Sequence, residues 1–284
     1  MEWQAGGGGV RLDRRPEPRI DFTVPRHCLT GGFDISCRLP SHSVLPLLAF
    51  LARDQTRYLR YPVRLITKPS RVTIHGAHLP IPDGFPPDRT RSLYRERHER
   101  TTVRAVLGGL SRDDVVMEFG AGLGLLSTLC AQRIGSDRVV TYEANPAQIP
   151  YIEEVYRLNG VCPTLVHGAI GTTNDQNVFW VHDNIVSSSL LSSEGGGDAV
   201  TVPQLDINDQ IDRYKPTFVI MDVEGMEGEL LAAARLDPLE KVLVELHHAR
   251  LGEDGIAALM QRMNDCGFLV NRWLSSRRKI FFER

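Results

Sequence analysis

Apolar residues in the second half of the chain occur in short runs that alternate with longer amphipathic stretches. The stretches with helical spacing cover residues 125–134, 145–159, 226–235 and 252–266. The apolar runs are Val115–Phe119, Arg138–Glu143, Thr164–His167, Thr217–Asp222 and Lys241–His247. Short apolar runs bounded by turn residues predict buried strands, and the stretches between them predict helices. The alternation predicts an α/β fold, in which an open parallel sheet carries helices on both faces.

The end of the chain predicts an antiparallel edge to this sheet. Residues 268–274 and 279–282 form a closing pair of strands, and one antiparallel edge strand is common on such sheets. Two shorter strands, at residues 178–182 and 199–202, flank a loop rich in serine and glycine (residues 182–197). The hydroxyl groups of this loop suit either a polyol substrate or a plain surface segment.

Upstream of these runs the pattern is less regular. Residues 43–59 predict a short amphipathic helix. Residues 71–81 predict a hairpin with a two-residue turn at Gly76-Ala77. A further helix, capped by Asp88, is expected over residues 88–107, and it is rich in arginine.

The change of pattern near Asp88 divides the chain into an N-terminal region of unknown role, residues 1–87, and a main domain, residues 88–284. The chain has 284 residues, 42% of them hydrophobic and 24% charged, which is typical of a globular protein. The longest apolar run, residues 44–52, has about half of the roughly 20 residues that a membrane helix needs. The first 30 residues carry no apolar leader, so we expect a cytoplasmic protein with no membrane partner.

Cysteine and charge patterns narrow the function classes further. The five cysteines are scattered and include no Cys-x-x-Cys pair, which argues against a disulfide scaffold or a zinc knuckle. Residues 1–112 contain 19 basic and 10 acidic residues, whereas the remainder contains 14 basic and 25 acidic residues. This split suits either attraction between the two parts or an anionic partner of the first part.

The strongest functional signal is a glycine-rich turn after the first strand of the main domain, Glu118-Phe-Gly120-Ala-Gly122-Leu-Gly124. Glycine lets backbone N–H groups and the start of the next helix approach a ligand closely. The Gly-x-Gly-x-Gly spacing differs from the Gly-x-Gly-x-x-Gly of dinucleotide sites. A carboxylate at Glu118 would repel a pyrophosphate, but it suits a ligand with an ammonium and a sulfonium, such as S-adenosylmethionine (SAM).

The ends of the next two strands extend this candidate nucleoside site. Glu143 ends the second strand, 19 residues after Gly124, and an acid there can accept hydrogen bonds from both ribose hydroxyls. NAD-dependent and SAM-dependent enzymes share this feature, so it does not choose between them. The third strand is followed by Gly168-Ala169, whose small size leaves room for an adenine ring, although a turn without a ligand fits almost as well.

Four titratable residues end the fourth and fifth strands: Asp222, Glu224, Glu245 and His247. Residues two apart on a strand share a face, so each pair is expected to point the same way. If the two strands are neighbours, all four side chains meet at the carboxyl edge of the sheet, where α/β folds bind ligands. Their open roles are general base, substrate hydrogen bonding and a divalent metal site. The spacing is not diagnostic of a metal, so a metal is not favoured and no metal ligand is assigned.

Taken in chain order, these motifs resemble the FkbM-type SAM-dependent methyltransferases. The likeness covers roughly residues 90–284 and rests on VVMEFGAGLGLLS, VVTYEANP, RLNG followed by VHGAIG, SSSL, FVIMDVEGMEGELL and VLVELHH. The segment DVEGME, between a buried strand and a helix, is the most specific of them. The chain departs from the family pattern at Glu118-Phe119, where Asp-Val is usual, and at Gly122, where Asn is common. Both replacements keep the chemistry.

The resemblance implies a class I methyltransferase fold, which is a Rossmann-like, seven-stranded sheet with an antiparallel last strand. It implies SAM as the cofactor and S-adenosylhomocysteine as its product. By position it also implies these cofactor contacts: Glu118, Gly120, Ala121, Gly122 and Gly124 at the methionine part, Glu143 and Ala144 at the ribose, Gly168 and Ala169 at the adenine, and Asp222 beside the transferred methyl group.

Members of that family mostly methylate hydroxyl groups of sugars and natural products, so we expect an O-methyltransferase of a small hydroxylated metabolite. The hydroxyl must lose its proton, and Asp222, Glu224 or His247 would accept it. One alternative is an NAD(P)-dependent oxidoreductase, but this chain lacks the Gly-x-Gly-x-x-Gly spacing of such enzymes. Another alternative is an RNA-directed methyltransferase that uses the arginine-rich helix. Few aromatic residues interleave there, so nucleic acid is not the favoured partner. A homo-oligomer remains open.

Overall fold

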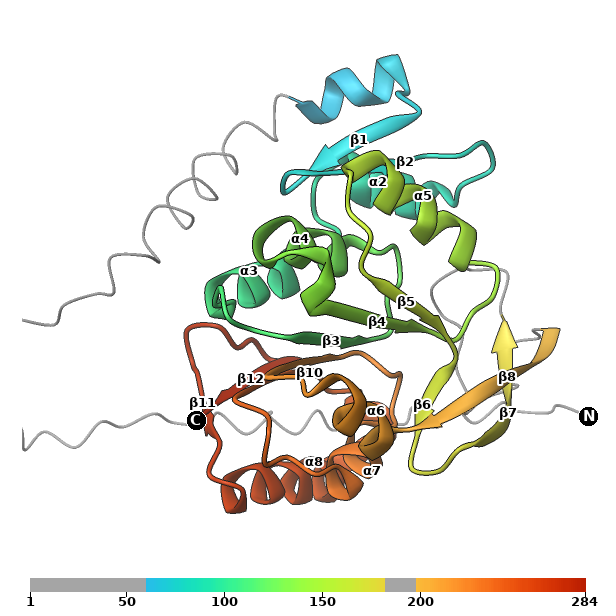
Figure 1. Cartoon of the computed structure of the whole chain (residues 1–284). Helices are drawn as coiled ribbons and strands as arrows, with labels where there is room; N and C mark the ends of the chain where they lie inside the picture. Colours follow the sequence, from blue (N-terminus) through green and yellow to red (C-terminus); the bar gives the residue numbers. More distant parts are fainter. Residues whose placement is uncertain (1–59, 182–197) are drawn as a thin grey trace, which may run out of the picture. The chain divides into compact units, whose positions relative to one another are not determined.

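The computed structural model describes residues 60–181 and 198–284 (Figure 1). Residues 60–67 form a helix. The helix expected at residues 43–59 and the serine-rich loop at residues 182–197 lie outside the described residues. None of the helices that are described is long and apolar enough to cross a lipid bilayer.

The main element of the fold is a seven-stranded sheet with the order β11-β12-β10-β9-β3-β4-β5. Strand β12 runs antiparallel to both β10 and β11, and the other neighbouring pairs are parallel. This confirms the expected Rossmann-like sheet with one antiparallel strand. The strands are β3 Val116–Phe119, β4 Val139–Glu143, β5 Thr164–His167, β9 Phe218–Met221, β10 Lys241–Glu245, β11 Leu269–Val270 and β12 Lys279–Glu283.

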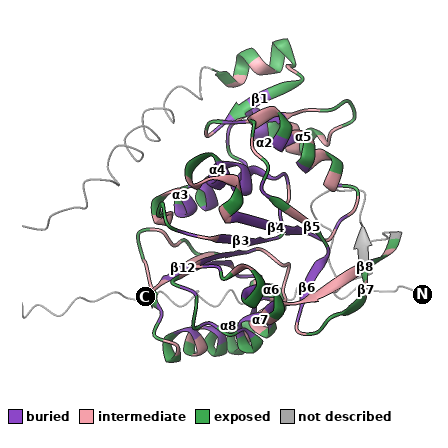
Figure 2. Ribbon diagram, viewed as in Figure 1, coloured by how far each residue is buried: buried purple, intermediate pink, exposed green. Residues whose placement is uncertain are grey.

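Alternate residues of the central strands pack against opposite layers of helices. Val116 of β3 and Phe218 of β9 belong to one hydrophobic cluster, whereas the next residues along, Met117 and Val219, belong to another. All four side chains are buried. A strand covered on both faces has mostly apolar residues on both, which is why these strands form nearly continuous apolar runs in the sequence. Figure 2 shows β3 and β4 as buried along their length.

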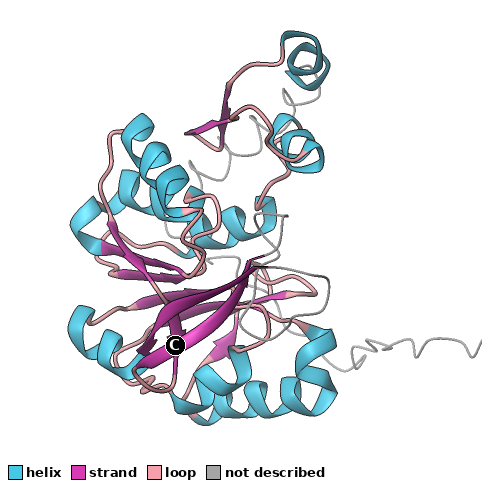
Figure 3. Cartoon of the chain, turned by 90° about the vertical axis from the view of Figure 1, so that its right-hand side faces the viewer, coloured by secondary structure: helices cyan, strands magenta, loops and turns pink. Residues whose placement is uncertain are grey.

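Helices cover both faces of the sheet (Figure 3). Helices α2, α3 and α4 contribute to the cluster that contains Val116, and α6, α7 and α8 contribute to the cluster that contains Met117. Helix α5 packs beside α4. The bounds are α2 Pro87–Tyr94, α3 Arg100–Gly109, α4 Leu125–Ile134, α5 Ile149–Asn159, α6 Ile207–Tyr214, α7 Glu227–Ala233 and α8 His248–Asp265, with a short 3-10 helix at Ser136–Arg138.

The expected single helix over residues 88–107 is wrong, because the chain turns between α2 and α3. Glu96 and Glu99 have φ angles of 53° and 51°, which a helix cannot contain. Tertiary contacts hold both residues in this conformation. Arg64 binds the carboxylate of Glu96 at 3.0 Å, and Lys279 binds that of Glu99 at 3.0 Å.

The hairpin before α2 consists of β1 Arg71–Ile74 and β2 Ala77–Pro80. Its turn is His75-Gly76 rather than the expected Gly76-Ala77, because Ile74 pairs with Ala77. His75 and Gly76 have φ angles of 54° and 107°. Positive φ at both central residues suits the right-handed twist of the two strands.

The hairpin packs into the core of the sheet. Ile74 and Leu79 have no exposed surface and belong to the same cluster as α4. The side-chain amide of Asn159, at the end of α5, donates to the carbonyl oxygen of His78 at 2.8 Å and accepts from its N–H at 2.8 Å. The hairpin is thereby tied to the layer that covers β3.

A second, three-stranded sheet has the order β6-β8-β7. It contains β6 Ala169–Gly171, β7 Asp175–Val181 and β8 Asp198–Asp206, so the two strands expected here are longer than their apolar residues indicate. Strand β6 and helix α6 were not predicted from the sequence. Asp206 caps α6 by accepting hydrogen bonds from the N–H groups of Asn208 and Asp209.

Candidate active site

The glycine turn after β3 runs against the carboxyl end of β9. Gly120 has a φ angle of 87°, and a Cβ atom at this position would lie 2.2 Å from the carbonyl oxygen of Asp222. The N–H groups of Gly120 and Ala121 both donate to the carbonyl oxygen of Tyr142 on β4, at 3.0 Å. Only glycine fits at position 120, so this residue sets how closely the turn approaches Asp222.

Gly122 has a different role in the turn. Its φ angle is 56°, and a Cβ atom there would have no other atom of the described residues within 4 Å. Gly124, in contrast, packs against α5, because its Cβ would lie 3.0 Å from Ile152. Gly122 therefore borders open space, whereas Gly120 and Gly124 are required by the packing of the protein itself.

A pocket opens on this side of the turn, and its wall includes four of the expected cofactor residues: Gly120, Ala121, Gly122 and Asp222. The same wall has five further polar residues. They come from the connection before α3, from the first turn of α3, and from β10 and β12: His98, Glu99, Thr102, Glu245 and Lys279. Glu245 was expected at this edge of the sheet, and the other four were not predicted from the sequence.

An ion network links these additional residues. The ammonium group of Lys279 donates to Glu99 Oε2 at 3.0 Å, to Glu245 Oε2 at 2.7 Å and to the hydroxyl of Thr102. Burial opposes the charge on Lys279, but the two carboxylates outweigh it and raise the pKa of the ammonium group. Burial likewise opposes the charge on Glu99, and Lys279 nevertheless lowers the pKa of that carboxyl. Two carboxylates thus share one ammonium, and Glu245 also binds the exposed guanidinium of Arg278 at 3.3 Å.

Glu118 lies inside the sheet and is not part of the pocket wall. Its side chain is buried, and its Oε2 accepts a hydrogen bond from the hydroxyl of Thr141 at 2.7 Å. Burial raises the pKa of Glu118 to about 8, although hydrogen bonds from Thr141 and Ser127 act in the opposite direction. The structure therefore places this acid beneath the glycine turn, in a site that favours the protonated carboxyl.

Glu143, at the end of β4, is bonded directly to the glycine turn. Its Oε2 accepts a hydrogen bond from the N–H of Gly122 at 3.0 Å, and its Oε1 accepts one from the N–H of Asn145 at 2.8 Å. The residue is only 6% exposed. Burial raises its pKa to about 7, although these hydrogen bonds act in the opposite direction.

The residues expected at the adenine lie beside Glu143. The N–H of Gly168 donates to the carbonyl oxygen of Glu143 at 2.9 Å. Ala169 is buried at the start of β6, and Ala144 packs against it. A Cβ atom at Gly168 would lie 3.0 Å from the carbonyl oxygen of Pro203. These residues lie outside the wall of the pocket itself, and their contacts with a nucleoside remain a prediction.

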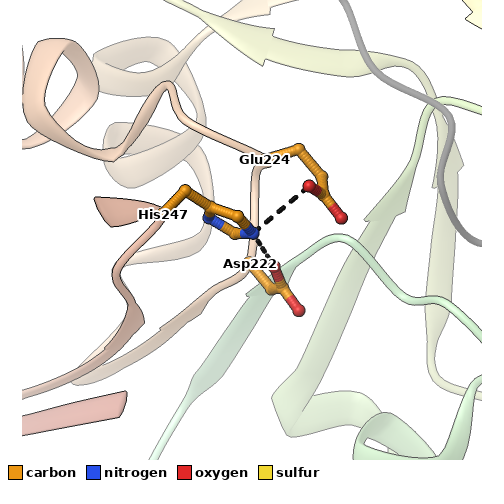
Figure 4. A group of neighbouring side chains, drawn as sticks. All are labelled: Asp222, Glu224 and His247. Carbon is orange, nitrogen blue, oxygen red and sulfur yellow. Dashed lines mark ion pairs between the residues drawn. The ribbon is translucent and has the colours of Figure 1, made fainter. Parts of the chain in front are cut away.

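Three of the four strand-end residues come together as expected (Figure 4). The shared-face argument does not explain this, because Glu224 lies in a turn after β9 with a φ angle of 53°. The Nε2 atom of His247 lies 3.2 Å from Glu224 Oε2 and 3.7 Å from Asp222 Oδ1. Glu245 does not join them: it binds Lys279 and Arg278, at 2.7 and 3.3 Å. The catalytic roles of the three clustered residues remain predictions.

Glu227 is a fourth member of this cluster, and it was not predicted from the sequence. Its side chain has no exposed surface. Its Oε1 lies 2.5 Å from His247 Nδ1 and also accepts a hydrogen bond from the N–H of Gly225 at 3.0 Å. Its only local signal was its place three residues after Glu224. That signal could not predict the contact with His247, because the contact depends on how α7 packs against the end of β10.

The carboxylates set the charge of His247. Burial opposes the imidazolium, but hydrogen bonds to Glu224 and Glu227 outweigh it and raise the pKa of His247 to about 10. The hydrogen bond to His247 in turn lowers the pKa of Glu224. Burial, with a smaller contribution from Glu245, raises the pKa of Asp222 to about 7. In this arrangement Asp222 can exchange a proton near neutral pH.

A comparison with families of known proteins identifies the chain. The family model of the methyltransferase FkbM domain matches residues 114–270, which is more than half of the chain. The chain belongs to the FkbM methyltransferase family. The match spans the glycine turn, Glu143, Asp222 and His247, and membership of the family makes the protein a SAM-dependent methyltransferase. No functionally curated protein matches the chain significantly.

Solved structures that match the chain include several methyltransferases. A methyltransferase from Pyrococcus furiosus is 14% identical, with a TM-score of 0.41 over 82% of this chain and 98% of that one. Precorrin-6y C5,15-methyltransferase from Geobacter metallireducens GS-15 is 16% identical, with a TM-score of 0.39 over 65% and 85% of the two chains. Trm5 from Methanocaldococcus jannaschii, in complex with adenosine, is 16% identical, with a TM-score of 0.40 over 75% and 54%.

Proposed function

We propose that this FkbM methyltransferase transfers the methyl group of SAM to a hydroxyl oxygen of a small molecule, such as a sugar or a natural-product intermediate. The observation that carries the proposal is the double position of Asp222. It lines the pocket beside the glycine turn, and it lies in the cluster with Glu224 and His247. The methyl donor and a group that accepts a proton would therefore meet at one residue.

Residues of the pocket, together with Glu143 outside its wall, suit the groups of SAM. The open space at Gly122 admits a ligand against the backbone of the turn. The carboxylates of Glu99 and Glu245 in the pocket wall suit the ammonium and sulfonium groups of the donor. Glu143 would hold the ribose hydroxyls, since a carboxylate can accept about four hydrogen bonds and those from Gly122 and Asn145 leave lone pairs on both oxygens.

The remaining cofactor residues would act around these. Gly120, Ala121 and Gly124 would shape the site for the methionine part, with Glu118 beneath it. Ala144 would lie at the ribose, and Gly168 and Ala169 would border the adenine.

The reaction follows from this placement. SAM supplies an activated methyl group when bound. The acceptor oxygen forms a bond to that methyl carbon as the carbon–sulfur bond breaks, and the bonding pair stays on sulfur. The hydroxyl proton passes to a carboxylate of the cluster, Asp222 or Glu224. General-base help of this kind contributes about 10²–10⁴-fold in rate, and alignment of the hydroxyl with the methyl group contributes further.

The experiment uses SAM with a deuterated methyl group and the full chain, incubated separately with the small-molecule fraction and with the RNA fraction of its native host. We expect one labelled product whose methyl group is on oxygen by mass spectrometry and NMR. The Glu143→Ala variant, which is expected to bind SAM more weakly, serves as the control. A label on nitrogen or on carbon would overturn the proposal, and so would a label found only in the RNA fraction.

The structure gives little support to an RNA substrate. The arginines of the expected helix are divided between α2, α3 and the turn between them. The guanidinium of Arg95 stacks on the ring of Tyr61, with 4.6 Å to its centroid, and Arg104 donates to the carbonyl oxygen of Trp273 at 3.0 Å. These two arginines contact the protein itself. The family match also gives no support to an NAD(P)-dependent oxidoreductase.

A further inference from the structure

We propose that Asp222, Glu224 and His247 bind one divalent metal ion, with Glu227 as the residue that positions His247. The proposed ion lies beside the methyl-donor pocket, because Asp222 belongs to both sites. The role suggested for the ion, which is to hold the acceptor hydroxyl, rests on the proposed function. The proposal that the ion binds does not depend on that function.

The three side chains have the geometry of a metal site. One ligand atom of each lies within 4.8 Å of the other two, and His247 Nε2 lies 3.2 Å from Glu224 and 3.7 Å from Asp222. Metal–ligand bonds of about 2.1 Å put neighbouring ligands of an octahedral ion about 3 Å apart and opposite ligands about 4.2 Å apart. Figure 4 shows the three groups pointing toward a common point.

The fourth residue supports the proposal independently of this geometry. A histidine that binds a metal commonly donates its second ring N–H to a carboxylate, which fixes the ring and directs the other nitrogen at the ion. Glu227 is placed for this, since its Oε1 lies 2.5 Å from His247 Nδ1 and its side chain is fully buried. The N–H of Gly225 holds the same oxygen. The imidazole Nε2 is thereby aimed at Asp222 and Glu224.

Asp222 supplies a second independent observation. Its Oδ1 atom is shielded from solvent and has no hydrogen-bond partner in the described part of the chain. A carboxylate oxygen in such a place is costly unless it meets a donor or a cation. The same oxygen is the atom that lies 3.7 Å from His247 Nε2, so a cation between the two groups would satisfy it.

Two of the nearby basic side chains are paired with a residue outside the cluster. Arg278 and Lys279 bind Glu245. Arg250 lies over Gly225, where a Cβ atom would meet its side chain at 2.5 Å. Arg250 and Arg278 lower the pKa of Glu224 and so reduce the negative charge of the cluster in part. With Glu227 included, three carboxyl groups still surround one imidazole.

The ligand set points to the kind of ion and acceptor. One imidazole with two carboxylates suits Mn²⁺, Fe²⁺ or Zn²⁺ better than an ion that prefers oxygen ligands alone. Three protein ligands leave open positions on an octahedral ion. An acceptor with two adjacent oxygens, such as a vicinal diol or a hydroxy acid, could occupy two of them and place one oxygen next to the methyl group.

The test measures Mn²⁺ binding to the full chain after treatment with EDTA, by electron paramagnetic resonance and calorimetry, with and without SAM. We expect one Mn²⁺ per chain. His247→Ala and Asp222→Asn are expected to weaken binding more than about tenfold, and Glu227→Gln by about 10–100-fold, as is usual for a residue behind a metal ligand. Glu229→Gln is the matched control: this residue is exposed, lies on the same helix as Glu227, and is outside the cluster.

Two results would overturn the proposal: no Mn²⁺ binding by the wild-type chain, or equal binding by wild type, His247→Ala and Asp222→Asn. Asp222 is partly exposed, so Asp222→Asn is expected to fold. It can therefore test the metal site even if Glu227→Gln, at a buried position, does not fold. The outcome is separate from that of the proposed function. If the chain binds SAM but not Mn²⁺, only the proposed metal site is wrong. If it binds Mn²⁺ but not SAM, the proposed methyl transfer is wrong and the metal site stands.

Discussion

Glu143 and Gly122 are joined by a hydrogen bond of 3.0 Å, from the backbone N–H of the glycine to the carboxylate. The end of β4 and the glycine turn are thus held together as one unit. Each oxygen of a carboxylate has two lone pairs, so Glu143 can hold a nucleoside without releasing the turn.

Replacement of Glu143 by alanine is expected to weaken SAM binding at least tenfold. A hydrogen bond to a charged group contributes about 1.5–3 kcal/mol, and about 1.4 kcal/mol is a factor of ten in affinity. Calorimetry of SAM binding measures the effect. Glu153→Ala is the control, since Glu153 is an exposed acid of α5. Equal affinities of the two variants would contradict the role given to Glu143.

SAM affinity is expected to rise between about pH 6 and pH 8. The pKa of Glu143 is about 7, and only the ionised carboxyl accepts hydrogen bonds from both ribose hydroxyls with full strength. Protonation below this pKa therefore weakens binding. Calorimetric titrations across this range test the slope, and Glu143→Gln is expected to flatten it. If Glu143→Gln keeps the wild-type slope, a group other than Glu143 causes the pH dependence.

Glu118→Gln is expected to flatten the dependence of stability on pH. The pKa of Glu118 is about 8 in the folded protein and about 4.3 in an unfolded chain. The folded state holds a proton that the unfolded chain releases, so its stabilisation is fully present below about pH 4 and is lost as the pH rises through about 8. Urea unfolding from about pH 5 to pH 9 measures this loss. Glu253→Gln, an exposed acid of α8, is expected to follow the wild type.

Gly122→Ala is expected to fold and to lose SAM affinity. Gly122 and Gly160 have φ angles of 56° and 63°, and a Cβ atom at either place would have no other atom of the described residues within 4 Å. Alanine in this left-handed conformation costs about 1–2 kcal/mol at either place. Only the methyl group at position 122 would enter the donor site. Equal SAM affinities of Gly122→Ala and Gly160→Ala would show that the turn does not contact the donor.

The sheet and α4 could be predicted from the sequence because their signals are local. Apolar runs mark strands that are covered on both faces, and the observed bounds of α4, Leu125–Ile134, match the expected ones. The break between α2 and α3 carried no such signal. Glu96 and Glu99 adopt positive φ angles although neither is a glycine, because distant basic residues hold their carboxylates.

The candidate site divides in the same way. Asp222, Glu224 and His247 could be predicted to meet, since each follows a strand whose direction the pattern sets. The contact between Glu99 and Lys279 could not, because 180 residues separate the two. It exists only once β12 has inserted beside β10 in the antiparallel direction.

The β1–β2 hairpin has a practical consequence for work on the enzyme. Ile74 and Leu79 are sealed against α4, and the backbone of His78 is paired with Asn159. A recombinant protein that starts at residue 88 would lack the hairpin, and the apolar residues of α4 that pack against it would be exposed to solvent. Shortened forms intended for crystallisation or ligand screening need to retain residues 71–80 if they are to remain in solution.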